Sequence, residues 1–129
     1  MKNEKIKIVL IEDDLVLGSL ILELLTLNDF IVNWFKDGQE ALKHLQKHLP
    51  NVIISDYTMP NMNGEELFLT IRKDSKYNAV PFIIITANME EDVKYRQLKN
   101  GVNDYIMKPF KVKDLIYKIK NVIDFNQKY

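Results

Sequence analysis

The sequence predicts an α/β fold of the doubly wound kind, in which helices cover both faces of a parallel sheet. Short, continuous apolar runs rich in branched residues recur along the chain, and such runs are typical of strands that are buried on both faces. Segments with the helical spacing of apolar residues lie between these runs. Because strands and helices alternate, we expect parallel strands joined by right-handed crossovers.

Five segments are expected to form the strands. Four of them are continuous apolar runs, and the second in chain order is less regular. In order they are IKIVLI at residues 6–11, FIVNWF at 30–35, VIIS at 52–55, FIIIT at 82–86 and DYIM at 104–107.

The intervening segments carry helix boundaries as well as apolar stripes. We expect the second helix to continue until Pro50 and Asn51, the third to begin at Gly64, and the last to span about residues 112–125. The stripes expected to be buried in the first two helices consist of Leu17, Leu20, Ile21, Leu24 and Leu25, then Ala41, Leu42, Leu45 and Leu49.

Length and composition favour one ordinary globular domain over residues 1–129. The 18 basic residues balance the 18 acidic ones, so no net charge draws the chain toward nucleic acid or anionic lipid. The absence of cysteine excludes disulfides and thiolate metal sites. The lack of cysteine agrees with a reducing compartment, and the cytoplasm is the expected location. No apolar run is long enough for a membrane span or a signal peptide.

Chemically useful side chains follow four of the five expected strands. In an open parallel sheet, ligands bind outside the carboxyl ends of the strands, where the strand order reverses. The residues delivered to that edge are Glu12, Asp13 and Asp14 after the first strand, Asp56 after the third, Thr86 after the fourth and Lys108 after the fifth.

This set of residues predicts a site for Mg²⁺ and phosphate. Two carboxylates about 4 Å apart repel each other by roughly 4 kcal/mol at an effective dielectric near 20, so Glu12, Asp13 and Asp56 need a counterion. Mg²⁺ prefers oxygen ligands and is used with phosphate oxygens. Asp56 is then a candidate nucleophile that forms an acyl phosphate, with Thr86 as a hydroxyl donor and Lys108 sharing the phosphoryl charge.

Taken together, these stretches resemble the receiver domains of two-component response regulators. The resembling pieces are VLIEDD at residues 9–14, IISDYTMPNMNG at 53–64, IIITAN at 83–88 and DYIMKPF at 104–110, within a match from about residue 5 to 125. The resemblance implies a flavodoxin-like sheet of five strands in the order 2-1-3-4-5 with five helices.

The resemblance also implies a role for each site residue. Asp56 would accept a phosphoryl group from a phosphohistidine of a sensor histidine kinase or a histidine phosphotransfer protein. Mg²⁺ would be held by Asp13, Asp56 and the backbone carbonyl of Thr58, with Glu12 helping directly or through water. Lys108 would pair with the phosphoryl oxygens. Such a domain is a phosphoacceptor that promotes its own phosphorylation and dephosphorylation, and we do not expect an enzyme.

Signal output is implied as well. Thr86 would move toward the phosphoryl group, Tyr105 would follow it, and the surface of the fourth helix, fifth strand and fifth helix would change. That surface would bind a downstream effector domain or protein and could also form a dimer, without direct contact with nucleic acid or membrane. The peptide bond between Lys108 and Pro109 is expected to be cis.

Three alternatives stay open. An aspartate-nucleophile phosphohydrolase needs a second aspartate two residues after the nucleophile, where this chain has Thr58. A flavin-binding module is disfavoured because the acids after the first strand would repel phosphate. A receiver-like scaffold that is never phosphorylated would not need residues suited to phosphoryl chemistry at these positions, whereas this chain has one at each of them.

Because Tyr57 rather than a tryptophan follows Asp56, Trp34 fluorescence is not expected to report on metal binding.

Overall fold

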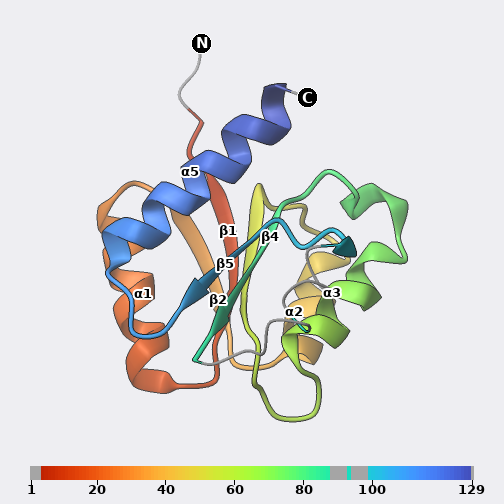
Figure 1. Cartoon of the computed structure of the whole chain (residues 1–129), viewed down its shortest axis with the longest axis horizontal. Helices are drawn as coiled ribbons and strands as arrows, with labels where there is room; N and C mark the ends of the chain where they lie inside the picture. Colours follow the sequence, from red (N-terminus) through yellow and green to blue (C-terminus); the bar gives the residue numbers. More distant parts are fainter. Residues whose placement is uncertain (1–3, 88–92, 94–98, 129) are drawn as a thin grey trace.

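A parallel five-stranded sheet forms the centre of the molecule (Figure 1). The structure, a computed structural model, describes residues 4–87, 93 and 99–128. The strand order β2-β1-β3-β4-β5 confirms the predicted topology. The strands are β1 (Lys7–Ile11), β2 (Ile31–Phe35), β3 (Val52–Asp56), β4 (Phe82–Thr86) and β5 (Asp104–Met107).

Four α-helices and one 3-10 helix lie within the described residues. The remaining expected helix, the fourth in chain order, belongs to the segment between β4 and β5, most of which lies outside the described residues. The helices are α1 (Leu15–Leu27), α2 (Gly38–Leu45), α3 (Gly64–Arg72), the 3-10 helix η1 (Ser75–Tyr77) and α5 (Val112–Lys128). In the part of the chain that the structure describes, no helix is long and apolar enough to cross a membrane.

The sheet separates two apolar cores. Helices α1 and α5 pack on one face, where Ile21 and Ile119 share a cluster with strand residues such as Ile54. Helices α2 and α3 pack on the other face, where Leu45 and Phe68 lie in a second cluster (Figure 1). Each strand of the sheet interior therefore buries both faces, which explains its continuous apolar sequence.

Helix α2 is shorter than the sequence predicts. It ends at Leu45 rather than near Pro50, and the carbonyl of Leu45 accepts a hydrogen bond from the hydroxyl of Tyr77. This contact satisfies one of the carbonyls that a helix end leaves unpaired. Leu49 lies beyond the helix and is 56% exposed, and Leu20 of α1 is 47% exposed, so both predictions of burial are wrong.

Asparagine side chains accept backbone hydrogen bonds at the amino edge of the sheet. The backbone N–H of Lys7 donates to Oδ1 of Asn51 at 2.7 Å, and the N–H of Phe82 donates to Oδ1 of Asn103 at 2.8 Å. Both asparagines are exposed and lie in the loops that lead into neighbouring strands. The first residues of β1 and β4 therefore find partners without any buried charge.

Candidate functional site

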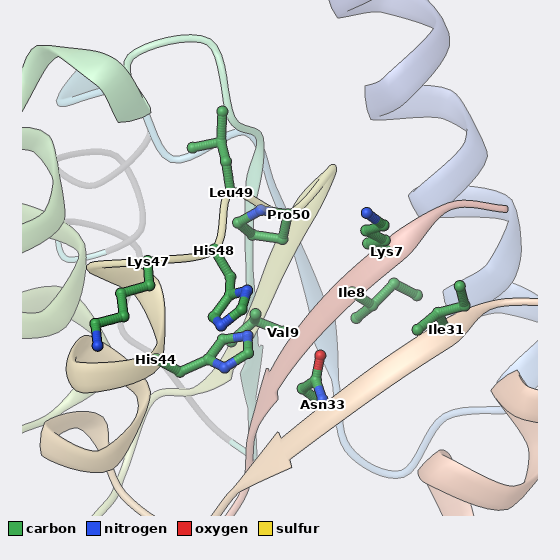
Figure 2. A pocket seen from close by; sticks show the side chains of 10 residues that line it. All are labelled: Lys7, Ile8, Val9, Ile31, Asn33, His44, Lys47, His48, Leu49 and Pro50. Carbon is green, nitrogen blue, oxygen red and sulfur yellow. The ribbon is translucent and has the colours of Figure 1, made fainter. Parts of the chain in front are cut away.

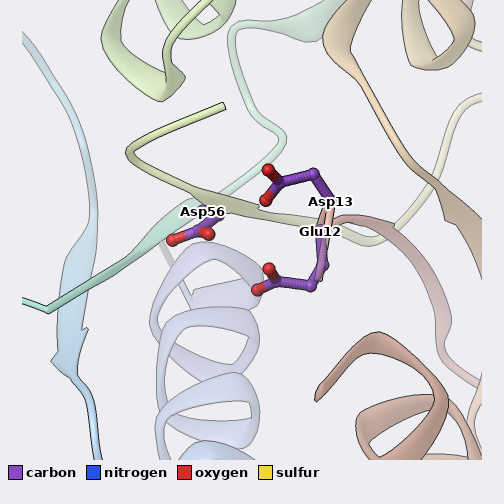
Figure 3. Close-up of side chains that lie close together, drawn as sticks. All are labelled: Glu12, Asp13 and Asp56. Atoms are coloured by element: carbon purple, nitrogen blue, oxygen red, sulfur yellow. The ribbon is translucent and has the colours of Figure 1, made fainter. Parts of the chain in front are cut away.

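Three carboxylates meet at the carboxyl edge of the sheet (Figure 3). Glu12 and Asp13 follow β1, and Asp56 is the last residue of the adjacent strand β3. One carboxylate oxygen from each of the three lies within 4.8 Å of the others. Glu12 and Asp56 are buried, whereas Asp13 is exposed. The sequence prediction that these acids gather at one edge is therefore confirmed.

Lys108 brings a positive charge to the same cluster from the end of β5. Its Nζ lies 3.1 Å from Oδ2 of Asp56 and 3.7 Å from Oε1 of Glu12. The backbone N–H of Lys108 donates to the carbonyl of Thr86 at 2.8 Å, which fixes the start of the loop after β5 against the end of β4. The Lys108–Pro109 peptide bond is cis, the geometry that the resemblance implied.

Burial and charge shift the pKa of two groups in this cluster. Burial raises the pKa of the Glu12 carboxyl to about 7, and the negative charge of Asp56 adds to that rise. For Lys108, burial acts to lower the pKa of the ammonium group. The hydrogen bond and charge of Asp56 and the charge of Glu12 outweigh that effect, so the pKa lies above its ordinary value.

The donor set fits a hard divalent cation. Oε1 of Glu12 is buried and has no hydrogen-bond partner within the described residues, which is an unfavourable arrangement for a carboxylate oxygen. Three carboxylates face one lysine, so the cluster is short of positive charge. Carboxylate oxygens are the ligands that Mg²⁺ and Ca²⁺ prefer, and Mg²⁺ commonly takes only one or two of them together with water and phosphate.

The loop between β3 and α3 is held tightly against Asp56. The N–H of Gly64 donates to the carbonyl of Tyr57 at 2.7 Å. A Cβ on Gly64 would lie 2.7 Å from the carbonyl oxygen of Asp56, so this position has room only for glycine. Asn63 then starts α3 through a capping box with Glu66. Thr58 lies exposed in this loop, two residues after Asp56.

Thr86 and Tyr105 lie on neighbouring strands. Thr86 is the last residue of β4 and is 2% exposed. Tyr105 of β5 pairs with Ile84 and belongs to the core beneath α2 and α3. The strand order places Thr86 on the strand next to that of Asp56, and Tyr105 on the edge strand beyond it.

The contacts that hold the end of β1 were not predicted from the sequence. Nε1 of Trp34 donates to the carbonyl of Glu12 at 2.9 Å, across 22 residues of chain. Oε2 of Glu12 accepts from the N–H of Asp14 at 3.1 Å, and Asp14 itself caps α1. No local pattern indicates the Trp34 contact, and the only sequence signal is an aromatic residue at the end of an edge strand.

A separate cavity of about 470 Å³ lies at the amino ends of β1 and β2 (Figure 2). His44 and His48 stack in its wall with ring centroids 4.4 Å apart, and Lys7 and Lys47 also contribute to its lining. Burial and the neighbouring His48 lower the pKa of His44. Because its lining contains no carboxylate among the described residues, this cavity is distinct from the acidic cluster.

Comparison with known proteins gives consistent matches. A sequence model of the response regulator receiver domain matches residues 8–120. Hybrid signal transduction histidine kinase D of Dictyostelium discoideum is 32% identical over 90% of this chain, which corresponds to 7% of that kinase. The phosphate regulon transcriptional regulatory protein PhoB of Rhizobium meliloti is 33% identical over 91% of this chain and 52% of its own length. The chain therefore spans about half, or much less, of these curated relatives.

Solved structures agree with the sequence matches. The receiver domain of a Francisella response regulator is 29% identical with a TM-score of 0.85, over 94% of this chain and 98% of that one. The receiver domain of a sensor histidine kinase from Pseudomonas aeruginosa PAO1 is 28% identical with a TM-score of 0.84, over 94% of this chain and 99% of that one. That structure has a magnesium ion coordinated in its active site cleft.

Proposed function

This chain belongs to the response regulator receiver domain family of two-component signalling, and on that basis we propose that it is a switch controlled by phosphorylation of Asp56. The observation that carries the proposal is the approach of Lys108 Nζ to within 3.1 Å of Asp56 Oδ2, beside two further carboxylates. A buried carboxylate paired with a lysine at an open strand end is positioned for nucleophilic attack.

The proposed reaction is transfer of a phosphoryl group from a phosphohistidine. A carboxylate oxygen of Asp56 attacks phosphorus, the new P–O bond forms as the P–N bond breaks, and the imidazole leaves with the electron pair and takes up a proton. The ammonium of Lys108 stays beside the transferred oxygens and offsets their charge. The product is an acyl phosphate on the chain itself, so the chain acts as a phosphoacceptor and not as a classical enzyme.

Asp13, Asp56 and the backbone carbonyl of Thr58 are the proposed Mg²⁺ ligands, with Glu12 acting directly or through water. When bound, Mg²⁺ supplies positive charge that neutralises the phosphoryl oxygens. Oε1 of Glu12 is buried and has no hydrogen-bond partner within the described residues, and the carboxylates of the cluster outnumber its lysine. Both observations support this assignment. The same charge balance would help the acyl phosphate to form and to be hydrolysed on this chain.

We propose that Thr86 and Tyr105 relay the change. The Thr86 hydroxyl would bond to the phosphoryl group, and Tyr105 would follow toward the site. Their burial on adjacent strands supports a shared movement. The surface that would change consists of β5, α5 and the segment between β4 and β5, most of which lies outside the described residues. A dimer through this surface is part of the same proposal.

The proposed phosphodonor is a sensor histidine kinase or a histidine phosphotransfer protein, and the proposed recipient of the signal is an effector domain or protein. The relatives support both, because they include histidine kinases and a transcriptional regulator. We place the exchange in the cytoplasm, with which the lack of cysteine in the sequence agrees. No direct contact with nucleic acid is proposed for this chain.

The decisive experiment is intact mass spectrometry after incubation with acetyl phosphate and MgCl₂. The native chain should gain the mass of one phosphoryl group, and Asp56→Asn should gain none. Asp114→Asn, an exposed acid in the first turn of α5, is the matched control and should be modified like the native chain. A native chain that stays unmodified with acetyl phosphate and with a phosphohistidine donor would overturn the proposal, and many turnovers of a phosphate ester would favour a phosphohydrolase instead.

A further inference from the structure

Both backbone polar groups of Glu12 are held by the end of β2. The N–H of Glu12 donates to the carbonyl of Phe35 at 3.0 Å, and its carbonyl accepts from Nε1 of Trp34 at 2.9 Å. The first contact is an ordinary continuation of the β1–β2 ladder. The second depends on one side chain, because only the indole N–H supplies it.

The indole is also fixed from its other side by α1. A Cβ on Gly18 would lie 2.2 and 2.4 Å from two ring carbons of Trp34, so the ring occupies the space that a side chain would otherwise fill. Gly18 is buried and lies on the same face of α1 as the buried Ile21 and Leu25. Trp34 is therefore wedged between α1 and the main chain of Glu12, with little freedom to turn away.

This wedge acts on the segment that carries two of the three clustered acids. The carboxylate of Glu12 is fully buried and accepts from the N–H of Asp14, and Asp14 caps α1. The chain from residue 12 to 14 is thus anchored by Trp34 on one side and by the helix cap on the other. Both contacts hold the main chain that carries Glu12 and Asp13 beside Asp56.

We propose that Trp34 is a positioning residue for the cation site and that its fluorescence reports when the site is filled. Trp34 was expected to be silent because Tyr57, not a tryptophan, neighbours Asp56, whereas the structure places the Trp34 indole against the main chain of Glu12. This inference rests on the proposed function in one respect, namely that the acidic cluster binds Mg²⁺.

Isothermal titration calorimetry with MgCl₂ tests the positioning role. Trp34→Phe keeps an aromatic ring but removes the N–H, and we expect it to weaken Mg²⁺ binding roughly tenfold, the lower end of the loss usual when an outer-shell partner of a metal site is removed. Tyr77→Phe is the matched control. It also deletes an aromatic donor to a backbone carbonyl, that of Leu45, but away from the acids, and it should leave the Mg²⁺ affinity unchanged.

Fluorescence provides the second readout. Trp34 is the single tryptophan of the chain, so emission excited at the red edge of tyrosine absorption comes from it alone. The native emission should change saturably with MgCl₂, at the same midpoint as the calorimetric titration. Asp13→Asn retains Trp34 and should lose that response. Gly18→Ala should displace the ring, shift the emission and weaken Mg²⁺ binding together.

The outcomes separate the two proposals. If the native chain binds no Mg²⁺ by calorimetry, the proposed function fails and this inference falls with it. If the native chain binds Mg²⁺ but Trp34→Phe binds it equally well and the native emission is unchanged, only the role of Trp34 is overturned. If Trp34→Phe does not fold, Gly18→Ala and the native fluorescence decide, since both retain the indole.

Discussion

The carboxyl and amino edges of the sheet satisfy their polar groups in opposite ways. Within the described residues, the buried polar or charged side chains all lie at the carboxyl ends of strands, and they are Glu12, Ser55, Asp56 and Thr86. At the amino edge, exposed asparagines accept the backbone hydrogen bonds of Lys7 and Phe82. Burying charge is unfavourable unless something pairs with it. The amino edge therefore satisfies its backbone groups without buried charge, whereas the carboxyl edge buries carboxylates beside a single lysine.

The strongest effect should come from pH at the carboxyl edge. Because burial raises the pKa of Glu12 to about 7, a proton competes with Mg²⁺ below that pH. The apparent Mg²⁺ affinity should fall as the pH drops below about 7, approaching tenfold per pH unit for one displaced proton. Calorimetric titrations between about pH 8 and pH 5 measure this, with Glu12→Gln as the control whose profile is flatter. Equal native affinities at the two ends of that range would contradict the prediction.

The same shift predicts how the metal-free chain behaves. The folded state holds the Glu12 proton more tightly than the unfolded state, whose carboxyl has an ordinary pKa. The stability contributed by this group is therefore complete below the unfolded value and is lost as pH rises through about 7. Urea unfolding in a chelator should show that loss in the native chain and not in Glu12→Gln.

Close packing beneath Asp56 gives the next effect in size. Gly64→Ala would force a Cβ against the carbonyl of Asp56, and we expect it to lower the free energy of unfolding by about 1–3 kcal/mol. Gly38→Ala is the matched control. Gly38 also begins a helix, but a Cβ there would lie 3.1 Å from the sulfur of the flexible Met62 side chain. Urea unfolding compares the two. Equal losses in the free energy of unfolding would contradict this prediction, because they would mean that the loop after β3 moves aside as easily as the Met62 side chain.

A smaller effect is expected at the amino edge. Asn103→Ala removes the acceptor of the Phe82 N–H, and the loss of one hydrogen bond near solvent should lower the free energy of unfolding by about 1 kcal/mol. The Mg²⁺ affinity should stay at the native value. Asn78→Ala, at the exposed end of η1, controls for the loss of an asparagine. A change in Mg²⁺ binding for Asn103→Ala would contradict the distinction between the two edges.

The weakest effect belongs to the ion pair at the start of β5. Nζ of Lys118 lies 3.1 Å from Oδ1 of Asp104, and both side chains are about one third exposed. Lys118→Met should lower the free energy of unfolding by roughly 0.2–1 kcal/mol, less at high salt because the pair is screened. A double-mutant cycle with Asp104→Asn at two salt concentrations isolates the pair. A coupling that is large and independent of salt would refute this prediction.

The strands and the acidic cluster were predictable because each depends on local sequence and on one geometric rule. A continuous apolar run marks a strand buried on both faces, and the residue after it must surface at the sheet edge. Parallel strands place all their carboxyl ends at the same edge, so Asp56, Lys108 and the acids after β1 were predictable neighbours.

Other features could not be read from local pattern. The apolar spacing continues to Leu49, so the predicted α2 was too long. Periodicity alone does not show that the hydroxyl of Tyr77, from another element, donates to the carbonyl at the end of the helix. The wedge of Trp34 against Gly18 joins residues from a strand and a helix, and its partner Glu12 lies 22 positions away. The predicted role of the segment between β4 and β5 falls mostly outside the described residues.

The sheet also separates the two apolar cores, so that their side chains do not share one cluster. Residues beneath α1 and α5 belong to one apolar cluster and residues beneath α2 and α3 to another, with the strands as the shared wall. Substitutions in separate clusters that share no contacts combine additively. The stability losses of one substitution beneath α1 and α5 and one beneath α2 and α3 should therefore add, so each helical layer can be redesigned separately.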